Sequence, residues 1–147
     1  LPGKKVLCIQ AMHYWYPLGH LGIESDFILE MKKRNTELYY LSFGGNHLLD
    51  RLSKQFYEQH DIRFEIIKEN FEKDTELAVI GDFVFKIRYP PEFIKNLEKI
   101  FKKTKDMKQF NFLELGKLIK SNYSISLTMF RDKSIAKSVR ESTLRYF

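Results

Sequence analysis

Short apolar runs and longer amphipathic runs alternate along this chain. The segments 4–10, 36–43 and 62–68 have the length and side-chain pattern of β-strands. Between them, residues 23–34 and 47–59 repeat apolar side chains at three- and four-residue spacing, which is typical of helices with one buried face. A strand–helix–strand–helix–strand order with short connections predicts a parallel sheet with right-handed crossovers.

The second half of the chain is less regular. Two apolar runs, 77–80 and 83–85, flank Gly81-Asp82 and form either a hairpin or one long bent strand. Pro90-Pro91 then opens a helix, and residues 102–106 are a polar connector. The last predicted elements are a helix at 111–120, a strand at 123–129 and a helix at 132–147 capped by Asp132.

This pattern predicts an α/β fold, namely a three-layer, Rossmann-like sandwich around a mostly parallel sheet of four to six strands. The length of 147 residues fits a single domain over residues 1–147, and no internal repeat is present. Because the chain begins without Met, we expect it to be a fragment of a longer chain.

The net charge and the composition of the chain limit which partners it can bind. A net charge of +6 suits an anionic partner, but acidic residues are interspersed throughout, which disfavours nucleic acid for this segment. No apolar run approaches the roughly 18 residues of a membrane span, and no signal peptide is present, so we expect a cytoplasmic location. The single Cys8 cannot form an internal disulfide.

Sequence motifs for cofactors and metals are missing. No Gly-x-Gly-x-x-Gly follows the first strand, and no P-loop is present. No histidine pair has ligand-like spacing with a third partner nearby. The sequence therefore predicts neither a metal nor a cofactor.

The segment 13–22, between the first strand and the first helix, carries the richest chemistry. In a parallel sheet such a loop lies at the carboxyl end of the strands, where ligands bind. A neutral imidazole there can act as a general base, so His20 and His13 are the two candidate catalytic residues. The alternative is that each histidine caps a helix or packs under the loop.

Three further residues of this loop are candidates for substrate binding. Gly19 allows close backbone approach, and Trp15 and Tyr16 can stack on a sugar or a base. Packing of these rings onto the domain is the competing interpretation for Trp15 and Tyr16.

A second candidate binding segment ends the second strand. Gly44 and Gly45 would make a tight turn that opens a ligand cleft, and Asn46 would cap the following helix. A plain strand-to-helix turn is the alternative.

Several blocks of the first half resemble the opening of a GT-B glycosyltransferase, over residues 4–68. They are Lys5-Val6-Leu7-Cys8-Ile9, Pro17-Leu18-Gly19-His20, the helix end 28–35, the strand 37–42 and Gly44-Gly45. The resemblance implies the acceptor-binding half of an enzyme that transfers a sugar from a nucleotide-sugar donor to a hydroxyl acceptor. It also implies that His20, or His13, deprotonates the acceptor. The family's second, donor-binding domain has no counterpart in this sequence.

Two other classes of function remain open. One is the ligand-sensing effector domain of a transcription regulator, in which the aromatic loop forms an effector pocket and no proton moves. The other is a cobalamin- or nucleotide-binding Rossmann-like module of a larger enzyme, although the cobalamin motif Asp-x-His-x-x-Gly is missing. Contact with a second domain or with a membrane surface is a further expectation.

Overall fold

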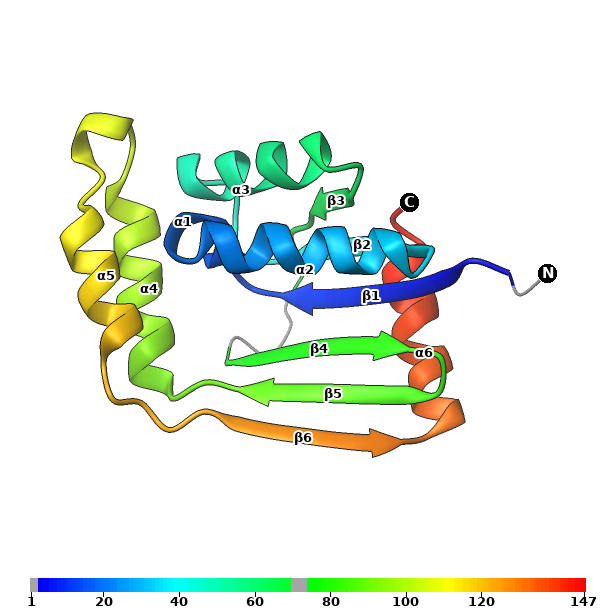
Figure 1. Cartoon of the computed structure of the whole chain (residues 1–147). Coiled ribbons are helices and arrows are strands. Elements are labelled where there is room, and N and C mark those ends of the chain that lie inside the picture. The colour runs from blue at the N-terminus through cyan, green and yellow to red at the C-terminus, as the bar shows by residue number, and fades with distance from the viewer. Residues whose placement is uncertain (1–2, 70–73) are drawn as a thin grey trace.

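A computed structural model describes residues 3–69 and 74–147 of the chain (Figure 1). It contains one open six-stranded sheet with the strand order β3-β2-β1-β4-β5-β6. The strands are β1 (Lys5–Ala11), β2 (Thr36–Ser42), β3 (Arg63–Ile66), β4 (Thr75–Ile80), β5 (Phe83–Arg88) and β6 (Ser126–Arg131). The predicted α/β class is confirmed, and the sheet has a strand number within the predicted range.

The sheet is mixed, so the prediction of a mostly parallel sheet is wrong. β1 pairs with β2, and β2 with β3, in parallel, but the pairings β1–β4, β4–β5 and β5–β6 are all antiparallel. The left-handed backbone of Gly81, at φ 56°, makes the β4–β5 hairpin. Side-chain periodicity reports which face of a strand is buried but not which way the strand runs, so the pattern could not show that the strands after β3 are antiparallel.

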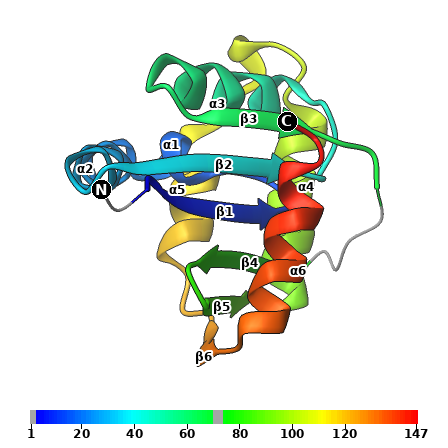
Figure 2. The same cartoon turned by 90° about the vertical axis from the view of Figure 1, so that its right-hand side faces the viewer.

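Helices lie on both faces of the sheet. On one face, Ile28 of α2 and Tyr57 of α3 pack with Leu7 and Tyr40. On the other face, Ala136 of α6 packs with apolar side chains of β1, β4 and β5. Figures 1 and 2 show α2 in front of the sheet and α6 behind it. The helix bounds are α1 (Tyr16–Gly19), α2 (Leu21–Lys33), α3 (Leu48–Gln59), α4 (Pro91–Lys103), α5 (Phe112–Lys120) and α6 (Lys133–Leu144), with a 3₁₀ turn at Met107–Gln109.

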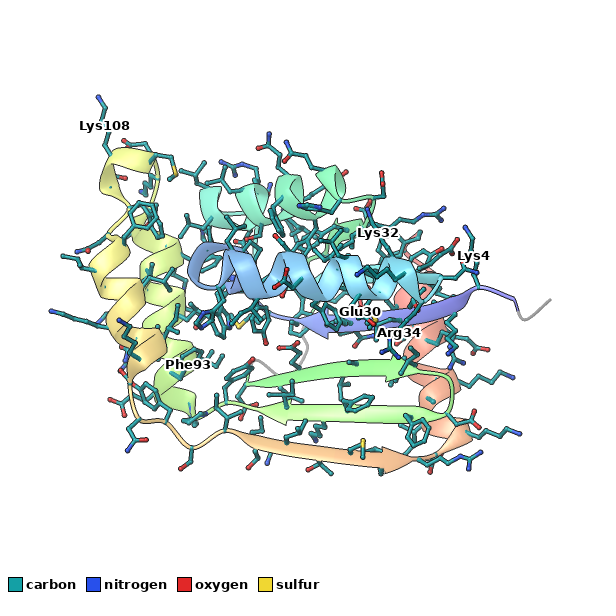
Figure 3. The ribbon with its side chains drawn as sticks, viewed as in Figure 1. Lys4, Glu30, Lys32, Arg34, Phe93 and Lys108 are labelled. Atoms are coloured by element: carbon teal, nitrogen blue, oxygen red, sulfur yellow. The ribbon has the colours of Figure 1, made fainter. Side chains whose placement is uncertain are left out.

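A helical hairpin of α4 and α5 closes the end of the sheet where β1 stops (Figure 1). Leu97 and Phe101 of α4 belong to one buried cluster with Met12 and Trp15, which follow β1. Figure 3 shows Phe93 at the base of α4, where its ring stacks on Tyr89. The carboxyl end of β1, where the sequence predicts a ligand cleft, is therefore filled by apolar packing.

The front of the β4–β5–β6 half has no helix across it in Figure 1. Alternation along β5 and β6 places Phe83, Leu127 and Met129 on that face. Their exposed fractions are 44%, 67% and 62%. This face of β5 and β6 therefore presents exposed apolar side chains.

Gly44 lies where the chain leaves β2, and there is no room for a side chain. A Cβ at this position would lie 2.2 Å from the carbonyl oxygen of Met12 and 2.5 Å from the ring of His13.

We expect Gly44→Ala to lower the free energy of unfolding by about 1–3 kcal/mol, the usual cost of overpacking. Urea denaturation measures this change. Gly116→Ala in α5, where nothing lies within 4 Å of the new Cβ, is the control and should stabilise by about 1 kcal/mol. Equal stability of Gly44→Ala and the wild type would contradict the packing.

Candidate functional site

His13 is buried beneath α4 and faces no open cleft. Its ring lies 4.2 Å from that of Phe101, and its Nδ1 is 2.8 Å from Oδ1 of Asp50. The hollow beside His13 and Trp15 has a volume of about 10 Å³, which is the room of one water molecule at most. The position of His13 is that of a packed core histidine.

Asp50 ties this histidine to the start of α3. Its second oxygen, Oδ2, accepts a hydrogen bond of 2.9 Å from the backbone N–H of His47. The residue before α3 is His47, so the expectation that Asn46 caps this helix is wrong. The carbonyl of Asn46 instead accepts a hydrogen bond from Arg51. The pair of His13 and Asp50 therefore fixes the segment after β1 against α3.

The other predicted residues of the first loop do not converge on one cavity. His20 is exposed between α1 and α2, with its ring 5.8 Å from Trp15. Trp15 is 9% exposed and packs against Tyr16 and Phe93. Gly19 lies next to Ile119 of α5. In this structure the loop is a packed connection.

The two glycines after β2 also serve the local backbone. Gly44 lies so close to His13 that there is no room for a Cβ, and Gly45 has a left-handed φ of 116°. Such a backbone favours glycine whether or not a ligand is bound. The geometry at these positions is accounted for by the turn into α3.

A different cavity, which we call the carboxyl–tyrosine pocket, lies between α2 and strands β1 and β4. Its volume is about 270 Å³, and its walls are mainly apolar and aromatic. Two carboxyl groups, those of Glu24 and Glu76, belong to its lining. The full lining is Ile9, Tyr14, Tyr16, Ile23, Glu24, Phe27, Tyr40, Tyr57 and Glu76.

Glu76 of β4 is the buried carboxyl of this pocket. Only 8% of the residue is exposed. Its Oε2 accepts hydrogen bonds from the hydroxyl of Tyr16, at 2.8 Å, and from that of Tyr89, at 3.1 Å. Burial raises the pKa of Glu76 to about 7, against the opposing effect of these two hydrogen bonds.

Glu24 of α2 brings the second carboxyl. Its Oε1 accepts a hydrogen bond of 2.8 Å from the hydroxyl of Tyr57. Burial raises the pKa of Glu24 as well, and the charge of Glu24 contributes to the raised pKa of Glu76. Two carboxylates beside one apolar cavity are costly when both are ionised, so the pocket favours a cation or a strong hydrogen-bond donor.

Tyr16 is the one predicted site residue that lines this pocket. The sequence motifs indicate neither Glu24 nor Glu76 as a site residue. A signal for Glu76 does exist in the sequence, because alternation places Glu76, Ala78 and Ile80 on one face of a strand. A carboxyl in line with apolar side chains indicates a polar group at a buried position.

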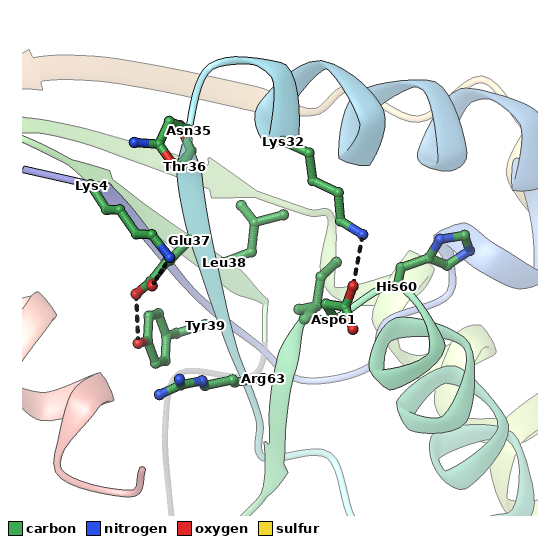
Figure 4. Close-up of a pocket in the computed structure, with 11 residues that line it drawn as sticks. Lys4, Lys32, Asn35, Thr36, Glu37, Leu38, Tyr39, His60, Asp61 and Arg63 are labelled. Carbon is green, nitrogen blue, oxygen red and sulfur yellow. Dashed lines mark hydrogen bonds and ion pairs between the residues drawn. The ribbon is translucent and has the colours of Figure 1, made fainter.

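A second cavity of about 250 Å³ opens at the amino end of β2 and β3 (Figure 4). Its acidic groups are already paired, since Glu37 contacts Lys4 at 3.1 Å and Asp61 contacts Lys32 at 3.3 Å. The guanidinium of Arg63 lies 5.2 Å from the ring centre of Tyr39. Figure 3 shows Lys4 and Lys32 at the same end of the molecule, exposed on its surface. This polar cavity is a weaker candidate because its opposite charges satisfy one another in water.

The described residues 3–69 and 74–147 contain no cluster of three or more His, Cys, Asp or Glu side chains that could hold a metal ion. Within the same residues, every helix is too short or too polar to cross a bilayer.

Comparisons with protein-family models, curated proteins and solved structures found no match to this chain. The residues of the carboxyl–tyrosine pocket are therefore the basis for a function.

Proposed function

We propose that this domain binds a small organic cation in the carboxyl–tyrosine pocket. The ligand class is an amine or amidine attached to a compact apolar body. The observation that carries the proposal is Glu76, a buried carboxyl with a pKa of about 7 in the lining of an apolar cavity. Perturbed carboxyl groups in a concave apolar site are typical of functional sites.

The chemistry of the walls supports a cation over a neutral ligand. A bound ammonium group would offset the repulsion between Glu24 and Glu76 and favour the ionised form of both. The aromatic rings of Phe27 and Tyr40 line the same cavity and would attract the cation through their π faces. A volume of about 270 Å³ is just below the usual range for drug-sized ligands, so the ligand is small.

A domain that binds this cation and catalyses no reaction would be an effector-sensing domain. The sequence predicts such a domain, that of a transcription regulator, as an alternative to the transferase. This is the function that the geometry supports best. The pocket lies between the sheet and α2, so a bound ligand would contact α2 directly, and this needs no catalytic base.

A second proposal, the acceptor-binding half of a glycosyltransferase, is supported by two observations. The strand order 3-2-1-4-5-6 is that of a Rossmann sheet, although three of its pairings are antiparallel. A carboxyl with a pKa of about 7 is also suited to accept a proton from a hydroxyl at neutral pH. In this version of the transferase proposal the base is Glu76, in place of His20 or His13.

Benzylamine is a suitable probe of the cation site, and benzyl alcohol is its uncharged partner. Titration followed by ¹H–¹⁵N NMR should shift the amides of Ile9, Phe27 and Glu76 with the amine. Glu76→Gln should weaken benzylamine binding about tenfold or more, because a charge-assisted contact of about 1.4 kcal/mol or more is lost. Glu30→Gln is the matched control on α2, since Glu30 is exposed and pairs with Arg34.

Equal binding of benzylamine and benzyl alcohol would refute the cation site, as would equal affinity of the wild type and Glu76→Gln. Titration with methyl glucoside, a model of a hydroxyl acceptor, separates the two proposals. Binding of the glucoside with shifts at the same three amides, together with no binding of benzylamine, would favour the acceptor half of a transferase over the effector domain.

A further inference from the structure

A recess lies at the amino end of β1, remote in the fold from the packed end under α4. We call it the amino-end recess. It is bounded by the start of β1, the β4–β5 turn and α6, and its volume is about 540 Å³. Its lining is Lys4, Lys5, Val6, Ile80, Gly81, Phe83 and Arg140.

The recess follows from the register of the sheet. On the β4 side of β1 the last pair is Leu7 with Ile80, because the chain turns back at Gly81. On the other side, Lys5 still pairs with Thr36 of β2. Two residues of β1 therefore extend past the hairpin with no strand beside them on one side, and this leaves the space that the recess occupies.

The recess combines cationic side chains with an apolar floor. Lys4, Lys5 and Arg140 belong to its lining, and no carboxylate does. Val6, Ile80 and Phe83 are the apolar residues of the lining, and Phe83 is 44% exposed. The ring of Phe83 also lies 6.0 Å from the guanidinium carbon of Arg131.

The three cations of the recess differ in how they are held. The guanidinium of Arg140 donates a hydrogen bond to the carbonyl of Gly81, which fixes it over the turn. Lys4 contacts Glu37, which lies outside the recess. Lys5 is exposed at the start of β1. The recess thus carries more positive charge than its own lining neutralises.

We propose that the amino-end recess binds a small organic anion, a carboxylate or phosphate monoester carried on a flat apolar body. The anionic group would lie among the cations and the apolar body on Phe83 and Ile80. Both parts are needed, since surface cations alone hold a small anion only weakly. This site is independent of the carboxyl–tyrosine pocket, which selects the opposite charge.

The probes are 2-naphthoate and 2-naphthyl phosphate, with 2-naphthol and inorganic phosphate as single-feature controls. NMR titration should shift the amides of Val6, Gly81 and Phe83 with both naphthyl anions. Either head group supports the site, and the tighter one identifies the ligand class. Lys5→Gln should weaken binding about fivefold, because a surface charge contributes up to about 1 kcal/mol. Lys137→Gln, exposed on α6 and paired with Glu141, should leave it unchanged.

Three results would overturn the proposal. They are 2-naphthol binding as tightly as 2-naphthoate, inorganic phosphate binding as tightly as 2-naphthyl phosphate, and unchanged affinity in Lys5→Gln. Arg140→Gln should also weaken binding, about tenfold for loss of a charge-assisted contact, but it removes the bond to Gly81. Within residues 3–69 and 74–147 the Lys5 side chain makes no hydrogen bond or ion pair, so Lys5→Gln tests the proposal even where Arg140→Gln fails to fold.

Discussion

Replacing Asp50 with alanine is expected to lower the free energy of unfolding by about 2–4 kcal/mol, from about 1–3 kcal/mol for a buried hydrogen-bonding group left without its partner and about 1 kcal/mol for the lost helix cap. The side chains of His13 and Asp50 are each 1% exposed, so water cannot replace the lost partner. The same substitution removes the acceptor for the backbone N–H of His47 at the start of α3. The measurement is chemical denaturation followed by circular dichroism.

Asp26→Ala is the control for this experiment, because Asp26 is exposed on α2 and such substitutions stay within about 0.5 kcal/mol. His13→Ala should reproduce much of the loss, and the double variant should cost less than the sum of the two single variants. An additive double variant would show that the two side chains do not interact.

Glu76→Gln is expected to remove a pH dependence of stability. In the folded protein the pKa of Glu76 is about 7, raised from 4.5 by burial. Between these values the folded state keeps a proton that the unfolded state has released. The stabilisation is therefore complete below pH 4.5 and is lost as the pH rises through 7. The loss amounts to about 3 kcal/mol, from 1.36 kcal/mol for each pKa unit.

Denaturation curves from pH 4 to pH 8 measure this effect as the difference between the wild type and Glu76→Gln. The variant should gain stability relative to the wild type as the pH rises. Glu30→Gln should run parallel to the wild type, because Glu30 is exposed and pairs with Arg34. A wild-type curve that rises from pH 5 to pH 7 relative to Glu76→Gln would show that the carboxyl is not held neutral by burial.

The sequence predicted the positions of the elements well where the local pattern is strong. The helices α3 and α5 begin within one residue of their predicted starts, and Asp132 caps α6 as expected, since its Oδ1 accepts a hydrogen bond from the N–H of Ile135. The short α1 was missed because four residues around Pro17 are too few to show a helical period.

The candidate site was harder to predict because it depends on contacts between distant segments. Glu76 meets Tyr16 across 60 positions of the chain and Tyr89 across 13. The closure of the sheet end by α4 depends on how the second half of the chain returns. The sequence around His13 and His20 carries no information about the contacts of Glu76 or about the closure of the sheet end by α4. The catalytic role predicted for the two histidines therefore depended on the assumption of an open parallel sheet.

The central strand β1 is held by β2 in parallel on one side and by β4 in antiparallel on the other. Ile9 lines the pocket on one face, and Gln10 bonds to Thr143 of α6 on the other. Inserting or deleting one residue within β1 would exchange these two faces along the rest of the strand. A change of length within β1 should therefore disrupt both faces at once, whereas a change of length in a loop leaves the register intact.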